Sequence, residues 1–207
     1  MGRADRLRQL IAREAARLMF EDGVHEYRDA KRKAARQFGS DRALALGSHL
    51  PSNAEIHAEV RRLIGFHEEE ALPGRLLRLR LVALAQMEML EPFRPFLVGS
   101  VLSGEVTERS DIDLHLFAES CEEVEAYLEK KGIPFQQETV TIRHGGEFFE
   151  YPHIYLEENG VVVECTVYHF SDIRRVPKSS ITGRAMERAD AKRLRRIIAE
   201  MARTPPD

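Results

Sequence analysis

The chain has 207 residues, of which 43% are hydrophobic and 31% charged, and its formal net charge is −3. This is the composition of a globular protein with enough residues for one large or two small domains, and it excludes an intrinsically disordered chain. A membrane-spanning helix is excluded because no apolar run reaches about 18 residues, and we expect no secretory signal because the N-terminus lacks an apolar stretch. Two cysteines, Cys121 and Cys165, are too few for a disulfide scaffold or a zinc cage, so we expect a reducing, cytoplasmic setting.

Charge is spread unevenly along the chain. Residues 1–91 carry a net charge of +2, residues 92–170 of −10 and residues 171–207 of +5. Solvated helices rich in Lys, Arg and Glu produce such blocks, but so does a protein whose acidic segment binds metal ions while basic flanks approach a polyanion. Composition does not distinguish these two interpretations.

The N-terminal part is predicted to be helical, because apolar residues recur at three-to-four-residue spacing and no strand pattern occurs before residue 95. Gly23, Gly39 and the pair Pro73-Gly74 stand where these helices are expected to end or break. Helices are predicted over residues 3–21 and 25–38, from Pro51 onward, and over residues 75–90.

Beyond residue 95 the apolar period shortens to that of strands. His144-Gly145-Gly146 and Glu157-Glu158-Asn159-Gly160 have the turn chemistry of hairpins. Strands are predicted over residues 96–99, 112–117, 134–143, 147–156 and 161–169, and helices over residues 120–131 and 184–203. The expected fold is α+β, with a helical domain over 1–91, a mixed-sheet domain over 92–207 and a C-terminal helix that packs back on the sheet.

Residues 97–117, LVGSVLSGEVTERSDIDLHLF, place two aspartates at the start of a predicted strand. Side chains two residues apart point to the same face of a strand, so Asp111 and Asp113 should project together, roughly 6–7 Å apart. The neighbouring apolar residues, Ile112 and Leu114, turn to the opposite face. Two carboxylates so close repel each other unless a cation bridges them, and their oxygens suit Mg²⁺ or Mn²⁺.

Gly99-Ser100 ends the previous predicted strand, with ten residues between it and Asp111. Glycine lets a backbone approach an anion closely, and the amides at the N-terminus of a following helix point toward it. An Asp-x-Asp or a Gly-Ser turn alone is common without function. The combination, in this order and on strands, indicates a metal and phosphate site.

The combined motif resembles the signature of the nucleotidyltransferase superfamily, which includes DNA polymerase beta, the CCA-adding enzymes, and the aminoglycoside and minimal nucleotidyltransferases. That signature is a hydrophobic residue, Gly, Gly or Ser, a gap of roughly ten residues, and then Asp-hydrophobic-Asp/Glu-hydrophobic. Val98-Gly99-Ser100 and Asp111-Ile112-Asp113-Leu114 match it in full, and the resemblance covers about residues 95–170.

The resemblance implies a third carboxylate on a later strand, and Glu164 is the candidate. Glu164 interrupts the β-branched run of residues 160–168, on the face shared by Val162, Thr166 and Tyr168. A carboxylate in such a strand is costly unless it is paired or bound to a metal, although an edge strand with a wet polar face would also tolerate it.

By the same resemblance, Asp111, Asp113 and Glu164 are the expected catalytic and metal-binding residues, holding two Mg²⁺ or Mn²⁺ ions against a nucleoside triphosphate, with ATP as the expected donor. Glu164 would stand beside the attacking hydroxyl and help to deprotonate it, and in-line attack on the α-phosphate would release pyrophosphate. Many minimal members carry an arginine where this chain has Ser103, and Arg109 is the candidate to supply that charge. The expected nucleotide-binding residues are Gly99, Ser100, Arg109 and Ser110.

The predicted helix over residues 25–38 carries Arg28, Arg32 and Arg36 at four-residue spacing on one face, with Lys31 beside them. This spacing suits the phosphates of a nucleic-acid strand, although a solvated basic helix has the same pattern. We therefore expect these four residues to bind the acceptor, and the acceptor to be a tRNA-like RNA.

Two other interpretations stay open. The acidic middle segment is compatible with a small-molecule or protein acceptor, as in an antibiotic-modifying or toxin-like enzyme. A degenerate domain that binds nucleotide or RNA without chemistry is the other interpretation, and the cluster of three acids argues against it. The sequence indicates no oligomeric state.

Overall fold

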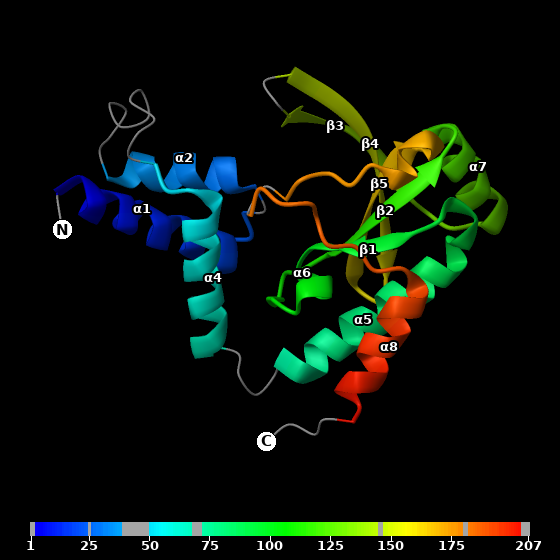
Figure 1. Ribbon diagram of the computed structural model, residues 1–207, viewed down its shortest axis with the longest axis horizontal. Helices are drawn as coiled ribbons and strands as arrows, with labels where there is room; N and C mark the ends of the chain where they lie inside the picture. The colour runs from blue at the N-terminus through cyan, green and yellow to red at the C-terminus, as the bar shows by residue number, and fades with distance from the viewer. Residues whose placement is uncertain are drawn as a thin grey trace. The chain divides into compact units, whose positions relative to one another are not determined.

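The structure, a computed structural model, describes residues 3–24, 26–38, 50–67, 72–144, 147–179 and 182–203. These residues form seven α-helices and a five-stranded mixed sheet, so the predicted α+β class is confirmed (Figure 1). The chain divides into two compact units. The first comprises residues 1–71, 107–109 and 178–184, and the second comprises residues 72–106, 110–177 and 185–207.

The first unit is built from the helices α1 (Arg3–Phe20), α2 (Tyr27–Gln37) and α4 (Asn53–His67). Its core combines Ile11 and Ile56 with alanines of α1 and α2, whose small side chains let helices pack closely. A capping box starts α4: the amide of Glu55 donates to Oγ of Ser52, and the Ser52 amide donates to the Glu55 carboxylate. The same carboxylate pairs with Arg8 of α1 at 2.6 Å, which ties α4 to α1.

The second unit contains the sheet, whose strand order is β1-β2-β5-β4-β3. The strands are β1 (Phe96–Val98), β2 (Ile112–Ala118), β3 (Gln136–His144), β4 (Glu147–Glu158) and β5 (Val161–His169). β2 and β5 are parallel, and the other neighbours are antiparallel. The helices are α5 (Leu72–Met89), α6 (Gly99–Ser103), α7 (Cys121–Lys131) and α8 (Ala191–Met201), with 3₁₀ turns over Glu91–Phe93 and Phe170–Arg174.

One face of this sheet is buried in the main hydrophobic core. Ile112 and Leu114 of β2 and Val163 and Cys165 of β5 are fully buried there, together with residues of α5, α7 and α8. Because side chains alternate along a strand, Asp113 and Glu164 project from the opposite face. This is the arrangement that the alternation in both strands predicts.

Helix α5 belongs to the unit that contains the sheet, where Leu79, Ala83 and Met87 join the main core. The sequence predicts a domain boundary at residue 91, whereas the compact units divide at residue 72. An apolar helical pattern shows that a helix is buried but does not show which neighbour buries it, so the pattern of α5 could not locate this boundary.

The C-terminal helix is shorter than the predicted range of 184–203. Asp190 caps it, accepting a hydrogen bond of 2.7 Å from the amide of Arg193, so the helix begins at Ala191. The preceding residue, Ala189, forms an isolated bridge with Leu97 of β1 instead of helix. The predicted helix end at Gly39 and most of the hairpin turn 144–146 lie outside the described residues.

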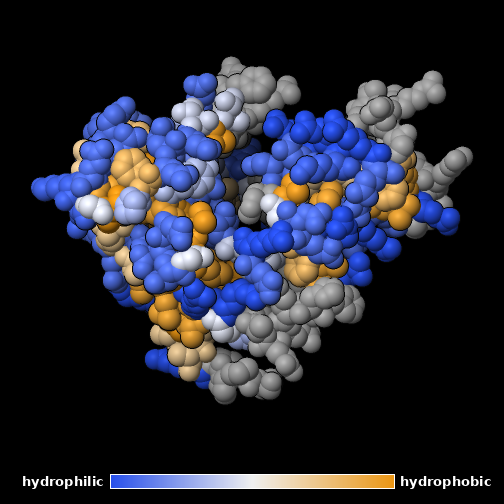
Figure 2. Space-filling view, turned by 180° about the vertical axis from the view of Figure 1, so that it is seen from behind, coloured by the Kyte–Doolittle hydropathy of each residue, from blue (hydrophilic) through white to orange (hydrophobic). Residues whose placement is uncertain are grey.

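Figure 2 shows one face of the molecule, on which hydrophobic residues lie between hydrophilic ones. Large hydrophobic side chains that are well exposed include Leu10, Leu81 and Phe170. Within the described ranges, every helix is too short or too polar to cross a membrane.

Candidate functional site

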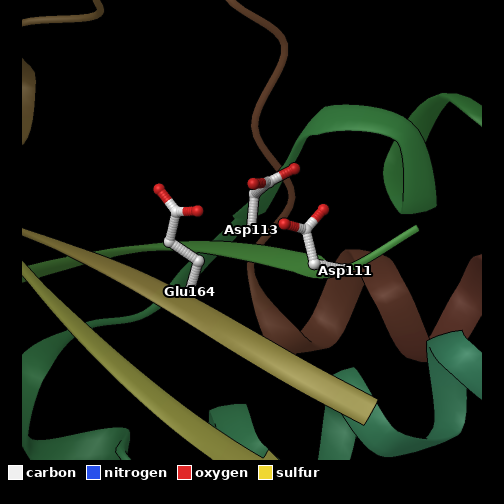
Figure 3. Close-up of side chains that lie close together, drawn as sticks. All are labelled: Asp111, Asp113 and Glu164. Carbon is white, nitrogen blue, oxygen red and sulfur yellow. The ribbon is translucent and has the colours of Figure 1, made fainter. Parts of the chain in front are cut away.

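Three carboxylates meet on the face of the sheet that the core leaves open. Asp111 directly precedes β2, Asp113 lies within it, and Glu164 lies on the parallel neighbour β5 (Figure 3). Each of the three offers a carboxylate oxygen, and these oxygens all lie within 4.8 Å of one another. The structure therefore brings together the three acids that the sequence proposes as catalytic and metal-binding residues.

Strand pairing is what places these acids side by side. Asp113 and Glu164 are direct partners in the parallel register of β2 and β5, so their side chains leave the sheet as neighbours. Asp111 stands two residues before Asp113 and shares its face. Figure 3 shows the three side chains rising from the sheet into one common space.

Gly99 forms the wall of the site next to Asp113. Val98 pairs with Asp113 across the antiparallel strands β1 and β2, so the chain after Val98 passes close to that carboxylate. A Cβ built on Gly99 would lie 2.9 Å from Cγ of Asp113 and would overlap its carboxylate. Gly99 also has a φ of +70°, in the left-handed region that glycine adopts readily and that most side chains disfavour. A side chain at position 99 would therefore displace Asp113.

A buried arginine of α5 holds the turn that follows Gly99 by hydrogen bonds. Arg80 of α5 donates to the carbonyl oxygens of Val101 and Leu102, each at 3.0 Å, and so satisfies the C-terminal end of the short helix α6. The carbonyl of Ser100 accepts from the amide of Gly104 at 2.8 Å. Gly99 and Ser100 thus open a turn whose backbone is fixed by hydrogen bonds.

The three acids repel one another in the metal-free protein. Burial raises the pKa of Asp113 well above its ordinary value of 3.8, and the negative charges of Asp111 and Glu164 raise it further. A divalent cation would remove this repulsion by compensating the negative charges of the three acids. A set of carboxylate oxygens is what Mg²⁺ and Mn²⁺ prefer, so the residues present fit these ions.

Two buried histidines lie beside the acids on the same face. His115 of β2 and His153 of β4 both pair with Thr166 of β5, one on each side. Burial lowers the pKa of His115 to about 4, with Arg188 and His153 contributing, so His115 is neutral near pH 7. His153 reaches the site itself, because its Nδ1 lies 2.7 Å from Oε1 of Glu164.

The aromatic residues that share this face mostly pack on one another. The ring of Tyr168 stacks on Phe117 at 5.7 Å between centroids and lies 5.2 Å from the ring of Tyr151. Tyr155 is the direct strand partner of Glu164 and is half-buried. Of the two β4 tyrosines on this face, Tyr151 thus has a packing role and Tyr155 borders the acids.

The four residues that the sequence proposes for nucleotide binding do not all belong to the same compact unit. Gly99, Ser100 and the half-buried Ser110 belong to the unit that holds the acids. Arg109 belongs to the first unit, where its side chain lies against Gly23 and its amide donates to Oγ1 of Thr107.

Three of the four residues proposed to bind the acceptor line a pocket of about 350 Å³ in the first unit. Arg28, Lys31 and Arg32 contribute to its wall, whereas Arg36 does not. Lys31 donates to Oδ1 of Asn53 at 2.6 Å, and burial lowers its pKa. Asp29 lies 3.2 Å from Arg32 and 3.8 Å from Arg28, so one acid offsets part of this charge. The other lining residues are Glu26, Tyr27, Leu50 and Asn53.

The position of His153 beside Glu164 is not evident from the motif, but it follows from the hairpin between β4 and β5. Asn159 and Gly160 both have positive φ, at 54° and 75°, as in a two-residue hairpin turn. Such a turn pairs Glu158 with Val161, and counting back along both strands pairs His153 with Thr166. The predicted turn therefore contained the signal that His153 lies next to the third acid.

No model of a known family matches this chain, and no curated protein matches it.

Proposed function

We propose that the protein is a metal-dependent nucleotidyltransferase, which moves a nucleoside monophosphate from a nucleoside triphosphate to an acceptor hydroxyl. The observation that carries this proposal is the convergence of Asp111, Asp113 and Glu164 beside a glycine that no other residue can replace without displacing Asp113. The motif Val98-Gly99-Ser100 followed by Asp111-Ile112-Asp113 resembles that superfamily, and the spatial proximity of its two parts supports the resemblance.

In the proposed reaction an oxygen of the acceptor hydroxyl attacks the α-phosphorus of the donor. The bond from that phosphorus to the oxygen bridging to the β-phosphate breaks, and pyrophosphate leaves with the electron pair. Asp111, Asp113 and Glu164 would hold two Mg²⁺ or Mn²⁺ ions, which supply positive charge to the triphosphate and to the entering and leaving oxygens.

The remaining steps, proton acceptance and phosphate binding, are assigned to groups of the chain itself. Glu164 lies on β5, which is one strand farther from β1 than β2 is. It would receive the proton of the attacking hydroxyl. The backbone at Gly99 and Ser100 is held in place through Arg80 and would bind the β- and γ-phosphates by its amides. ATP is the donor we propose.

RNA is the acceptor we propose. The supporting observation is the pocket in the first unit, where Arg28, Lys31 and Arg32 stand together with one aromatic residue, Tyr27. Cationic side chains bind phosphates, and an aromatic ring offers a stacking surface for a base. Arg36, one turn farther along α2 than Arg32, would extend this basic surface.

The test is a transfer assay in which purified protein meets Mg²⁺ or Mn²⁺, one α-labelled nucleoside triphosphate at a time, and total small RNA. The matched variants are Asp111→Asn with Asp113→Asn, which remove the acids, and Asp172→Asn, which changes a carboxylate outside the cluster. Label in an RNA band for wild type and Asp172→Asn only would support the proposal. Label on a small molecule or on protein would keep the chemistry and replace the acceptor. Binding of metal and nucleotide without transfer of label to anything would indicate a non-catalytic binding module.

A further inference from the structure

The third acid of the cluster is a glutamate, and this makes its position harder to maintain than that of the two aspartates. A glutamate side chain has one more rotatable bond than an aspartate, and ordering it costs more conformational entropy. The Glu164 side chain is 26% exposed, so the core does not immobilise it by burial. Its carboxylate therefore needs a partner that holds it.

His153 is in contact with that carboxylate. Nδ1 of His153 lies 2.7 Å from Oε1 of Glu164, although the two groups are not aligned as a straight hydrogen bond. A ring nitrogen and a carboxylate oxygen at this separation attract each other when the nitrogen carries a hydrogen, because two lone pairs so close would repel each other. β4 lies on the opposite side of β5 from β2, so His153 reaches Glu164 from the side away from the aspartates.

The imidazole of His153 is itself held firmly. Its side chain is 7% exposed, and its second nitrogen, Nε2, lies 3.4 Å from Oγ1 of Thr166. The Thr166 hydroxyl can donate to Nε2 or accept from it, so it accommodates either protonation state of the ring. A rigid, buried ring thus stands between a hydroxyl and the one flexible acid of the cluster.

From these contacts we infer that His153 is a positioning residue that holds Glu164 in place as the third metal ligand. The inference rests on the proposed function and deepens it. Groups that contact a metal ligand from outside the coordination sphere orient it, and their removal typically weakens metal binding about 10- to 100-fold. His153 would act through Glu164 and would not touch the substrate.

The test compares two substitutions of the same residue by Mn²⁺ titration, followed by electron paramagnetic resonance of the free ion. His153→Leu removes the N–H, whereas His153→Asn keeps an amide N–H close to the position of Nδ1. We expect His153→Leu to weaken Mn²⁺ binding about 10- to 100-fold, and His153→Asn to recover most of the loss. In the transfer assay the same order should appear in kcat, with the KM for the acceptor unchanged.

The matched control is His169→Leu, which breaks an exposed contact of 3.3 Å between His169 and Glu119, also in the second unit. It should leave Mn²⁺ binding at the wild-type level. Equal Mn²⁺ affinity of wild type and His153→Leu, or equal losses in the Leu and Asn variants, would overturn the inference while leaving the proposed function intact. Failure of the wild-type protein to bind Mn²⁺ at all would instead overturn the proposed function, and this inference with it.

Discussion

The carboxylate of Asp113 rests against the α-carbon of Gly99, on the neighbouring strand end, with no room for a β-carbon between them. This contact joins the two halves of the sequence motif, which lie ten residues apart along the chain. It also explains why the loop requires glycine on two independent grounds, the positive φ and the closeness of the acid. These two requirements can be separated by experiment.

Gly99→Ala should lose metal binding, and Gly160→Ala should not. Both glycines have positive φ, so each substitution costs about 1–2 kcal/mol of stability through backbone strain. Only at Gly99 does the added methyl group meet a carboxylate, whereas nothing lies within 4 Å of a Cβ at Gly160. Thermal denaturation measures the loss of stability that both variants share, and Mn²⁺ titration measures the loss of metal binding expected only for Gly99→Ala. Similar Mn²⁺ affinities of the two variants would show that the contact with Asp113 does not shape the site.

Asp113→Asn should raise or preserve the melting temperature of the metal-free protein while abolishing metal binding. The substitution removes a carboxylate that burial and two neighbouring acids keep under repulsion. Mn²⁺ at about 100 times its Kd should stabilise wild type by about 2.7 kcal/mol and the variant not at all. Differential scanning fluorimetry with and without Mn²⁺ measures both effects. A variant that unfolds in the absence of metal would assign Asp113 a structural role.

Mn²⁺ affinity should fall as the pH is lowered. The fall should occur at pH values well above those at which carboxyl groups ordinarily titrate. Because the pKa of Asp113 is raised in the folded protein, its proton must leave before a metal binds, and the affinity rises with pH until Asp113 is fully ionised. The same shift means that ionisation of Asp113 destabilises the metal-free fold as the pH rises above 3.8. Isothermal titration across the pH range, in buffers of different ionisation enthalpy, counts the protons released. An affinity that changes only near pH 3.8 would contradict the shift.

Combined substitution of Arg28, Lys31 and Arg32 by glutamine should weaken RNA binding and reduce its salt dependence. Each phosphate contact with a single strand contributes about 0.7 to the slope of log affinity against log salt, so the slope should fall by about 2. Arg13→Gln on α1, which removes a cation 3.7 Å from Glu59, is the control and should leave the slope unchanged. Fluorescence anisotropy with a labelled RNA at several salt concentrations measures it. An unaltered slope in the triple variant would remove α2 from the acceptor site.

Local patterns predicted much of the second unit. Alternation in β2 and β5 assigned Asp113 and Glu164 to the open face and Ile112 and Val163 to the core, because a strand has only two faces. The Asn159-Gly160 turn was likewise recognisable, since its two left-handed residues are those that hairpins select.

Relations between distant segments could not be predicted in the same way. No local pattern specifies that β2 pairs in parallel with β5, although this pairing is what sets Asp113 beside Glu164. Arg109 illustrates the same limit, because it lies two residues from Asp111 in sequence and yet belongs to the other compact unit. The sequence proposed it because Ser103 stands where many minimal nucleotidyltransferases carry an arginine, and in the structure its side chain lies against Gly23.

The most direct test of the proposed metal centre is a count of the Mn²⁺ ions bound by the wild-type protein in the presence of a non-hydrolysable ATP analogue. Electron paramagnetic resonance of free Mn²⁺ would measure it, beside the variant that combines Asp111→Asn with Asp113→Asn. Two-metal phosphoryl transfer predicts two ions per chain for wild type, and none for the double variant. Absence of bound Mn²⁺ in wild type, or equal binding by the double variant, would contradict the assignment of Asp111, Asp113 and Glu164 as a metal centre.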